Sequence, residues 1–496
     1  MKDSPAGMVP TRGFLSAAMK PRPSFNDGSS PEPLPVMTTS TSRQYHNSLR
    51  TPATAYSSHI LYTVYEFPDL LDSSSISSAG WTQIAESIYN NYALFDGFVI
   101  LHGTDSLAYT ASALSFIMSH LGKPVILTGS QASIFSLQSD AVDNLLGSLI
   151  IAGTFSIPEV CLFFHHTLYR GNRTTKTSSS SFDAFASPNH EPLGKVTGMG
   201  ITINWPLVRC AKTIARFSLA NLLRTSHVSC LRIFPGITVE MLDAFLRVPG
   251  LRGLILETFG AGNAPAGEDG AMTSVLQAAV QRGLVIVNVS QCSNGTVSPL
   301  YAPATILGNA GVVFGHDLTT EAALTKLFFL LSNPDLTQAE ITRQMGTSIR
   351  GEMTELASTQ FEHPSGHAAS VSGEQVAFTA LGYAIAKGDV ASITNLLAAD
   401  EHSLLTLSDY AGNTAIHLAA MSEDAEVLRL LLLKGASVHV RNGLGHTPLY
   451  LAEKMGHGEQ VGLLRDSGAH RHVEEVGTGN ATPVVRSCGM EDGEEG

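Results

Sequence analysis

The sequence GFVILHGTDSLAYTASALSFIMSHLGKPVILTGSQ, residues 97–131, contains two uninterrupted apolar runs separated by one helical pattern. The runs FVIL and PVIL predict buried strands, and the helical pattern between them ends at Gly122. Continuous apolar strands that alternate with helices indicate a parallel sheet covered on both faces. Ligands of such sheets bind at the carboxyl ends of the strands, where this segment places Thr104 and Asp105.

The same alternation continues on both sides of this segment. Upstream, residues 60–67 (ILYTVYEF) predict a strand and residues 81–92 (WTQIAESIYNNY) an amphipathic helix. Downstream, strands and helices alternate again after an irregular stretch at 183–225. We therefore expect an α/β fold with two similar parallel-sheet lobes and a site between them. The expected boundaries are 58–205 for the first lobe, 206–225 for a linker and 226–350 for the second lobe.

Residues 145–164 form the most membrane-like stretch of the chain. Pro158 and Glu159 interrupt it, so a buried helix followed by a buried strand is expected in place of a membrane span. No signal-peptide pattern is found at the N-terminus, and the cysteines show no CxxC spacing. These features predict a cytoplasmic protein with reduced thiols and no membrane contact. The five cysteines are Cys161, Cys210, Cys230, Cys292 and Cys488.

Composition restricts the kind of protein further. A chain of 496 residues exceeds the roughly 250–300 residues at which single cores stop growing, so two or three domains are expected. With 44% hydrophobic and 15% charged residues, it has enough apolar material for folded cores. The formal net charge of −13 and the lack of a basic stripe argue against a nucleic-acid partner.

A repeated pattern follows the two lobes. Segments beginning at Thr379, Thr414 and Thr447 share the core Thr-x-(Leu/Ile)-x-x-Ala, and the last two lie 33 residues apart. This spacing and composition are typical of ankyrin repeats, which stack as helix pairs. An all-α domain of about three ankyrin repeats is therefore expected at 376–472, with a protein as its possible partner. Histidine is a usual structural element of the repeat, so His417, His439 and His446 do not predict a metal site.

The remaining segments are expected to lack regular structure. Residues 1–57 form an irregular N-terminal segment that is rich in Ser, Thr and Pro. Residues 351–375 form a polar linker, and residues 473–496 form an acidic, disordered tail.

The turn from His102 to Asp105 has two interpretations. Thr and Asp are common N-caps, and from this turn alone helix capping is the favoured role. The alternative is chemistry, because a hydroxyl and a carboxylate at this position emerge beside helix N-terminal amides that favour an anionic ligand. Sequence beyond the turn supports the second interpretation.

Several segments, in this order, resemble the bacterial-type L-asparaginases, a family of threonine amidohydrolases. Residues 97–131 are similar to the second signature of the family, LLDSSS to its substrate-holding loop, and RGNRTTK to its catalytic-lysine segment. ETFGAGNAP and AGVVFGHDLTTEAALTKL resemble its C-terminal domain. The resemblance covers about residues 58–350. Long animal members of this family carry ankyrin repeats and the label lysophospholipase.

The resemblance implies roles for seven residues. Asp72 would pair with the α-ammonium of an amino-acid substrate, while Ser73 and Ser74 hold its α-carboxylate; a zwitterion needs an anion and donors side by side. Thr104 would hold or activate the water or acyl group, Lys176 would take its proton, and Asp105 would orient Lys176 and contact the substrate. Asn263 would reach the active site of a neighbouring subunit, which implies a homodimer or tetramer. No metal or organic cofactor is implied.

Each of these residues also has an ordinary structural interpretation. Asp72, Ser73 and Ser74 can form a plain turn or N-cap, and Asn263 can be a loop asparagine with a local backbone hydrogen bond. Lys176 can be a surface lysine, although its RGNRTTK context argues against that.

The sequence departs from the family in one motif. Members of the family begin with a strand that runs into Thr-Gly-Gly-Thr-Ile-Gly, whose second threonine is the nucleophile. The 496 residues contain no such sequence, and Pro5 falls where the nucleophile belongs. The missing strand would be central in the sheet, so its neighbours would be left with unpaired backbone groups. We expect either that residues 1–6 come from an incomplete or alternatively started chain, or that this is a variant without amidase chemistry.

Two functions from different classes follow from the sequence. The first is an asparaginase that converts L-asparagine and water to L-aspartate and ammonia through an acyl-threonine intermediate. The second is an inactive asparaginase-like scaffold that binds proteins through its ankyrin repeats. A lysophospholipase ranks below both, because no GxSxG motif is present. An amidotransferase component acting on charged tRNA is disfavoured by the acidic charge.

Overall fold

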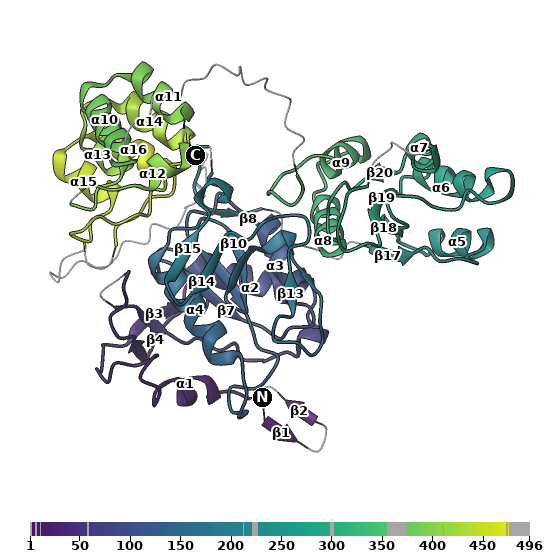
Figure 1. The fold of residues 1–496 in the computed structure, drawn as a ribbon, viewed down its shortest axis with the longest axis horizontal. Coiled ribbons are helices and arrows are strands. Elements are labelled where there is room, and N and C mark those ends of the chain that lie inside the picture. Colours follow the sequence, from purple (N-terminus) through teal and green to yellow (C-terminus); the bar gives the residue numbers. More distant parts are fainter. Residues whose placement is uncertain are drawn as a thin grey trace, which may run out of the picture. The chain divides into compact units, whose positions relative to one another are not determined.

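The computed structural model describes residues 2–4, 7–9, 11–56, 59–211, 213–220, 227–297, 302–354, 374–399, 401–409, 411–472 and 475. The chain divides into two compact units, residues 1–372 and 373–496. The first unit contains both α/β lobes, and the second contains the repeats (Figure 1). Pro5, most of the linker at 351–375 and the acidic tail except Glu475 lie outside the described residues.

The first lobe is built on a six-stranded sheet with the order β15-β14-β11-β10-β9-β7. Strands β7, β9 and β10 are parallel, as the sequence predicts, with Val99 opposite Ile126 and Ile126 opposite Cys161. The other three strands extend the sheet in antiparallel fashion. The strands are β7 (Phe98–Leu101), β9 (Val125–Thr128), β10 (Val160–Phe164), β11 (Thr167–Arg170), β14 (Gly194–Thr197) and β15 (Gly200–Ile203).

Helices cover both faces of this sheet. Helices α2 (Ser78–Asn91) and α3 (Leu107–Ile117) pack on the face that carries Val125 and Leu127. Helix α4 (Ala141–Thr154) packs on the opposite face, with Ile126. Alternate residues of one strand thus reach opposite cores, so β9 has no polar face and appears in sequence as a continuous apolar run.

The second lobe is a four-stranded parallel sheet with the order β17-β18-β19-β20. Helices α5 and α6 lie on one face and α8 and α9 on the other (Figure 1). The strands are β17 (Val228–Arg232), β18 (Gly253–Thr258), β19 (Val285–Ser290) and β20 (Val313–Phe314). The helices are α5 (Val239–Leu246), α6 (Ala271–Gln281), α7 (Ala302–Asn309), α8 (Thr320–Leu331) and α9 (Gln338–Met345).

Helices α3 and α8 join the two lobes. Every residue from Leu107 to Ile117 except the partly buried Tyr109 is buried, because α3 packs on its own sheet and on α8. Ser112 and Thr325 face each other across this contact, with their hydroxyl oxygens 2.7 Å apart. The two small hydroxyls satisfy each other, so this stretch of the contact carries no unpaired polar group.

Two stretches predicted to be irregular contain regular structure, and those predictions are wrong for the described residues. In the first 57 residues, Met19 and Phe25 are fully buried against α4, and the Tyr62 hydroxyl donates to the Phe25 carbonyl at 2.6 Å. The helix and strands of this segment are three to six residues long, which is too short for a helical or strand periodicity to show in the sequence. They are β1 (Lys2–Ser4), β2 (Gly7–Val9), α1 (Phe14–Met19), β3 (Leu34–Met37), β4 (Arg43–His46) and β5 (Ser48–Arg50), which pairs with β6 (Leu61–Thr63). In the stretch 183–225, the hairpin β14–β15 completes the first sheet.

The second unit is all-α in its described residues, as the sequence predicts. Thr414 and Thr447 are the N-caps of α13 and α15, so the repeated threonine marks the start of the first helix of a repeat. His417 Nε2 lies 3.1 Å from the His446 carbonyl and links two successive repeats. The helices are α10 (Glu374–Lys387), α11 (Val390–Ala399), α12 (Glu401–Thr406), α13 (Ala415–Met421), α14 (Ala425–Leu433), α15 (Pro448–Met455) and α16 (Gly458–Asp466).

Within the part of the chain that the structure describes, none of the helices has both the length and the apolar character needed to cross a membrane.

Candidate active site

The turn after β7 is held by a chain of hydrogen bonds behind it. His102 Nδ1 lies 2.7 Å from the Gly103 carbonyl, which can only accept, so this nitrogen carries the proton. His102 Nε2 then accepts from the Thr110 hydroxyl at 3.0 Å, and Trp81 Nε1 donates to the same hydroxyl at 3.0 Å. Burial lowers the pKa of His102 and keeps the ring neutral, as this arrangement requires.

The loop from Asp72 to Ser74 lies directly against this turn. A Cβ on Gly103 would stand 2.5 Å from Ser73 Oγ, so only glycine permits the approach. The Ser106 hydroxyl donates to the Ser73 carbonyl and joins the loop to the start of α3. Asp72 Oδ1 accepts from Ser74 Oγ at 2.6 Å and from Ser74 N at 2.9 Å, and these bonds lower the pKa of the exposed Asp72 carboxyl. The loop therefore presents an oriented carboxylate to solvent.

Lys176 joins the site from a different part of the chain. It lies in the short strand β12 (Thr175–Lys176), which pairs with β13 (Phe185–Ala186). Lys176 Nζ donates to Thr104 Oγ1 at 2.9 Å and to Asp105 Oδ1 at 2.8 Å. The lysine side chain is 20% exposed and the aspartate 64%, so the contact lies at the mouth of the site and is open to a ligand.

Gln131 is a member of the site that sequence reasoning missed. The Thr104 hydroxyl donates to Gln131 Oε1 at 3.1 Å, so Thr104 accepts from Lys176 and donates to Gln131. Gln131 Nε2 in turn donates to the carbonyls of Ser178 and Ser181. A signal was available, because Gln131 follows β9, the parallel neighbour of β7, and parallel strands end at the same sheet edge.

This arrangement has the components of an activated hydroxyl. A threonine hydroxyl is a weak nucleophile until a base is adjacent, and an amine at 2.9 Å is within the range for direct proton transfer. A carboxylate on the other side of the amine orients it and carries the opposite charge. The structure thus brings together Asp72, Ser73, Ser74, Thr104, Asp105 and Lys176 at one edge of the sheet.

Asn263 lies apart from these residues. It follows β18 in the second lobe, where it pairs with Phe259 in an isolated bridge. Its Oδ1 atom is buried and has no hydrogen-bond partner among the described residues. Its role at a neighbouring subunit stays a prediction.

Comparison with known proteins places three parts of the chain in known families. Residues 35–209 match the family model described as "Asparaginase, N-terminal", and residues 227–345 match the "Glutaminase/Asparaginase C-terminal domain". Residues 370–474 match "Ankyrin repeats (3 copies)". The first match begins within the segment that the sequence predicted to be irregular, in agreement with the elements found there.

Named relatives cover most of the chain. The "60 kDa lysophospholipase" of Mus musculus is 39% identical over 88% of this chain and 77% of its own length. The "L-asparaginase" of Dirofilaria immitis is 37% identical over 83% and 71%, and the "L-asparaginase 1" of Escherichia coli K12 is 45% identical over 59% and 85%. The crystal structure of L-asparaginase I from Vibrio cholerae is similar, with a TM-score of 0.55, 43% identity and coverage of 59% of this chain and 87% of that chain.

The two α/β lobes and these relatives support an amidohydrolase class of enzyme, extended here by ankyrin repeats. The chain belongs to the asparaginase family.

Proposed function

We propose that this chain is an L-asparaginase-type amidohydrolase that converts L-asparagine and water to L-aspartate and ammonia. The observation that carries the proposal is the position of Lys176 Nζ, within hydrogen-bond distance of both Thr104 Oγ1 and Asp105 Oδ1. These three groups supply a hydroxyl, a base and an orienting carboxylate beside a loop suited to an amino acid. The two relatives named L-asparaginase support the choice of substrate class.

In this proposal, Asp72 pairs with the α-ammonium of asparagine. The hydroxyls of the Asp72–Ser74 loop and its backbone hold the α-carboxylate, and Asp105 adds a second negative group for the ammonium. The substrate amide then lies beside Thr104. As a threonine oxygen attacks the amide carbon, Lys176 takes the hydroxyl proton, and it passes this proton to the amide nitrogen as the C–N bond breaks and ammonia leaves. In the second half-reaction water attacks the acyl-threonine, Lys176 takes a proton from the water, and it returns this proton to the threonine oxygen as the ester bond breaks.

The proposal requires no metal or organic cofactor. We further propose that the enzyme is cytoplasmic and forms a homodimer or tetramer in which Asn263 contributes to a neighbouring subunit. Light scattering of the purified chain tests the oligomeric state, and Asn263→Ala should lower activity without unfolding the protomer if the assembly completes the site.

One observation favours a second function, that of an inactive scaffold. The printed sequence contains no Thr-Gly-Gly-Thr segment. In the described residues, β7 is the edge strand of its sheet, and Leu101 at its end is 44% exposed. Under this alternative, the asparaginase-like body has no chemistry and the ankyrin repeats bind a protein partner.

One experiment separates the two functions. Ammonia release from L-asparagine is measured for the chain as printed, for Lys176→Met, and for a form in which a Thr-Gly-Gly-Thr-Ile-Gly strand precedes Gly7. Asparaginase function predicts ammonia release by the restored form, and its loss when Lys176→Met is added. A restored form that folds but releases no ammonia, and is indifferent to Lys176→Met, would exclude the enzyme and leave the scaffold.

Lysophospholipase and amidotransferase functions remain lower in rank. The mouse relative carries the first name, but no GxSxG motif occurs in this sequence. A relative from Methanobrevibacter smithii, named as a component of glutamyl-tRNA(Gln) amidotransferase, matches over 57% of this chain, and the acidic charge of this chain does not suit tRNA. Incubation with lysophosphatidylcholine should release no fatty acid.

A further inference from the structure

The segment that carries Lys176 belongs to the first lobe but is fastened by its side chains to the second. Asn172 Nδ2 donates to the Arg350 carbonyl at 3.0 Å. Arg173 Nη1 donates to Asp317 Oδ2 at 2.7 Å, and its side chain is 3% exposed. The Thr175 hydroxyl donates to Glu321 Oε1 at 2.7 Å.

Thr175 is the residue next to the lysine, and its partner is a buried carboxyl. Glu321 lies in the first turn of α8 and is 9% exposed. Burial raises the pKa of Glu321. Because the carboxyl also has little access to water, the hydrogen bond from Thr175 satisfies an oxygen that would otherwise lack a partner from solvent. Each residue of the two-residue strand β12 thus has its own contact. Thr175 is bound to Glu321 of the second lobe, and Lys176 is bound to Thr104 and Asp105 of the first.

A second element reaches the same segment from the C-terminal end of the unit. We call residues 349–354 the strap. Gly351 has a φ of +75°, and a Cβ at this position would clash with the Arg209 side chain and crowd the Arg170 guanidinium. This fit lets the Gly351 carbonyl accept from Arg173 Nε at 2.7 Å. Thr354 N donates to Asp317 Oδ1 at 2.9 Å, and its hydroxyl donates to Asp317 Oδ2, the oxygen that also accepts from Arg173.

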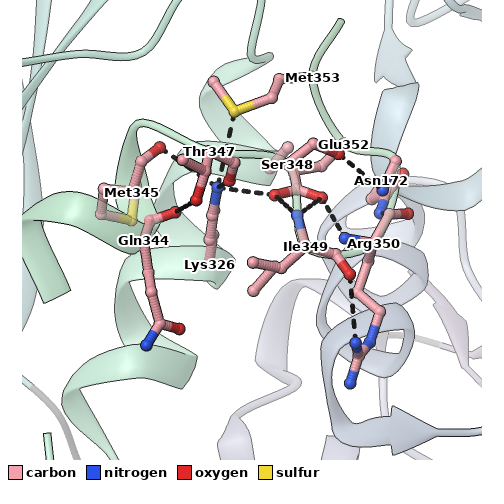
Figure 2. A network of polar contacts seen from close by, with 12 residues as sticks. Asn172, Lys326, Gln344, Met345, Thr347, Ser348, Ile349, Arg350, Glu352 and Met353 are labelled. Atoms are coloured by element: carbon pink, nitrogen blue, oxygen red, sulfur yellow. Dashed lines mark hydrogen bonds and ion pairs between the residues drawn. The ribbon is translucent and has the colours of Figure 1, made fainter. Parts of the chain in front are cut away.

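The strap is itself anchored in the core of the second lobe, as Figure 2 shows. Lys326 Nζ lies 2.6 Å from Glu352 Oε1, and both side chains are fully buried. The same ammonium donates to the carbonyls of Met345 and Thr347. The Glu352 carboxylate accepts from the backbone N–H groups of Ile349 and Arg350. A buried ion pair with this many hydrogen bonds fixes one backbone path for the strap.

We propose that Thr175 with Glu321, and the strap through Arg173 and Asp317, are positioning elements that set the place of the Lys176 amine against Thr104 and Asp105. The inference rests on the proposed function, in which that amine transfers a proton. Displacements of about 1 Å in such a group cost on the order of a hundredfold in rate. None of these residues touches the reacting atoms, so each acts only through Lys176.

The alternative is that these contacts merely hold the two lobes together. In that case, removing one would lower stability and leave the lysine where it is. The two cases differ in the chemical reactivity of the Lys176 amine, since an amine released from Thr104 and Asp105 is more open to an acylating reagent.

The test uses the full chain, four variants at Thr175 and Thr354, and one control variant. Thr175→Val removes the hydroxyl at nearly constant volume, and Thr175→Ser restores it. Thr354→Val and Thr354→Ser do the same in the strap at an exposed residue, so this pair carries the test should Thr175→Val fail to fold. Thr202→Val, which removes an exposed threonine-to-backbone hydrogen bond in the hairpin β14–β15, is the matched control.

Two quantities are measured: acylation of Lys176 by acetic anhydride, followed by peptide mass spectrometry, and ammonia release from L-asparagine. We expect both valine variants to acylate Lys176 several times faster and to lose about tenfold or more in kcat with little change in KM. The serine variants and Thr202→Val should match the parent.

Unchanged Lys176 acylation in folded Thr175→Val and Thr354→Val would overturn the positioning role, whatever the change in Tm. The acylation readout does not depend on turnover. If the acylation pattern appears but no form releases ammonia, the positioning of Lys176 stands and the proposed function fails.

Discussion

Lys176 Nζ lies 2.9 Å from Thr104 Oγ1, although 72 residues separate them in the chain. Thr104 is placed by the end of a parallel strand, whereas Lys176 lies in a two-residue strand outside that sheet. The contact therefore depends on the tertiary structure of the whole unit, and substitutions on either side of it test different parts of the site.

The first prediction concerns the amine and its carboxylate. Lys176→Met removes the base at similar length, and we expect kcat for L-asparagine to fall by about 10²–10⁴, the usual contribution of a positioned acid–base group. Asp105→Asn keeps an oxygen acceptor but removes the charge, so a smaller loss in kcat and a rise in KM are expected. Steady-state ammonia release measures both, and an unchanged kcat in Lys176→Met would rule out its role as the base.

The second prediction concerns Gln131. Its Oε1 atom is a hydrogen-bond partner of the Thr104 hydroxyl at 3.1 Å and helps to hold that group beside Lys176. Gln131→Met removes that acceptor, so the hydroxyl is free to rotate and kcat should fall by about tenfold, close to the loss of one well-placed hydrogen bond. Circular dichroism should be unchanged, because the backbone N–H of Gln131 keeps its bonds to Asp140. A kcat equal to that of the parent chain would show that the hydrogen bond from Thr104 to Gln131 does not contribute to catalysis.

The sequence was sufficient to predict the lobes because their strands are buried on both faces. Residues such as Val125, Ile126 and Leu127 are fully buried, so no polar position interrupts the apolar run. The expected helix end at Gly122 is wrong, because α3 ends at Ile117 and the short strand β8 (Met118–Ser119) follows it. The helix starts in the repeats were clear, since the threonine caps recur at Thr414 and Thr447. Local signals and tertiary environment agree at these elements.

The rest of the structure depended on contacts between distant residues. Phe25 is buried by α4 and Tyr62, which no pattern in the first 57 residues reveals. The partners of Arg173 and Thr175, namely Asp317 and Glu321, lie more than 140 positions away along the chain. Periodicity reports on the face that an element buries, but it does not identify the element that covers that face.

The third prediction concerns the buried pair of Lys326 and Glu352. Lys326→Met alone leaves a fully buried carboxylate without its cation, so we expect unit 1 to lose about 3–5 kcal/mol of stability. Burial alone would raise the pKa of Glu352, but Lys326 and the backbone donors lower it overall, and removing Lys326 reverses this balance. The double variant Lys326→Met with Glu352→Gln should recover much of the loss.

Tryptophan fluorescence during urea denaturation measures the unfolding of unit 1 in these variants. The two tryptophans of the chain, Trp81 and Trp205, both lie in unit 1. Lys434→Met, a change of the same kind in unit 2, should leave the tryptophan transition in place. Equal midpoints for Lys326→Met and the double variant would show that the two side chains are not energetically coupled.

The fourth prediction concerns the pH dependence of the repeats. His417 is fully buried in α13, accepts at Nδ1 from Thr414 N at 3.2 Å, and lies with Nε2 against the His446 carbonyl. Burial lowers the pKa of His417 to about 4, well below the value of about 6.5 in an unfolded chain. A group whose pKa falls on folding binds its proton more tightly when unfolded. Stability is therefore complete above about pH 6.5 and declines as the pH falls towards about 4.

The difference between these pKa values corresponds to about 3 kcal/mol between the two plateaus. Hydrogen exchange of peptides from residues 411–472, corrected for intrinsic rates and followed from pH 7.5 to pH 4.5, should show progressive loss of protection. His417→Gln keeps one acceptor and one donor without a titrating ring, so its protection should start lower and vary less over the same range. The difference between the two profiles isolates His417 from the other histidines of the unit. If the profiles run parallel, protonation of His417 does not destabilise the repeats, and its neutral, buried state in α13 would have to be abandoned.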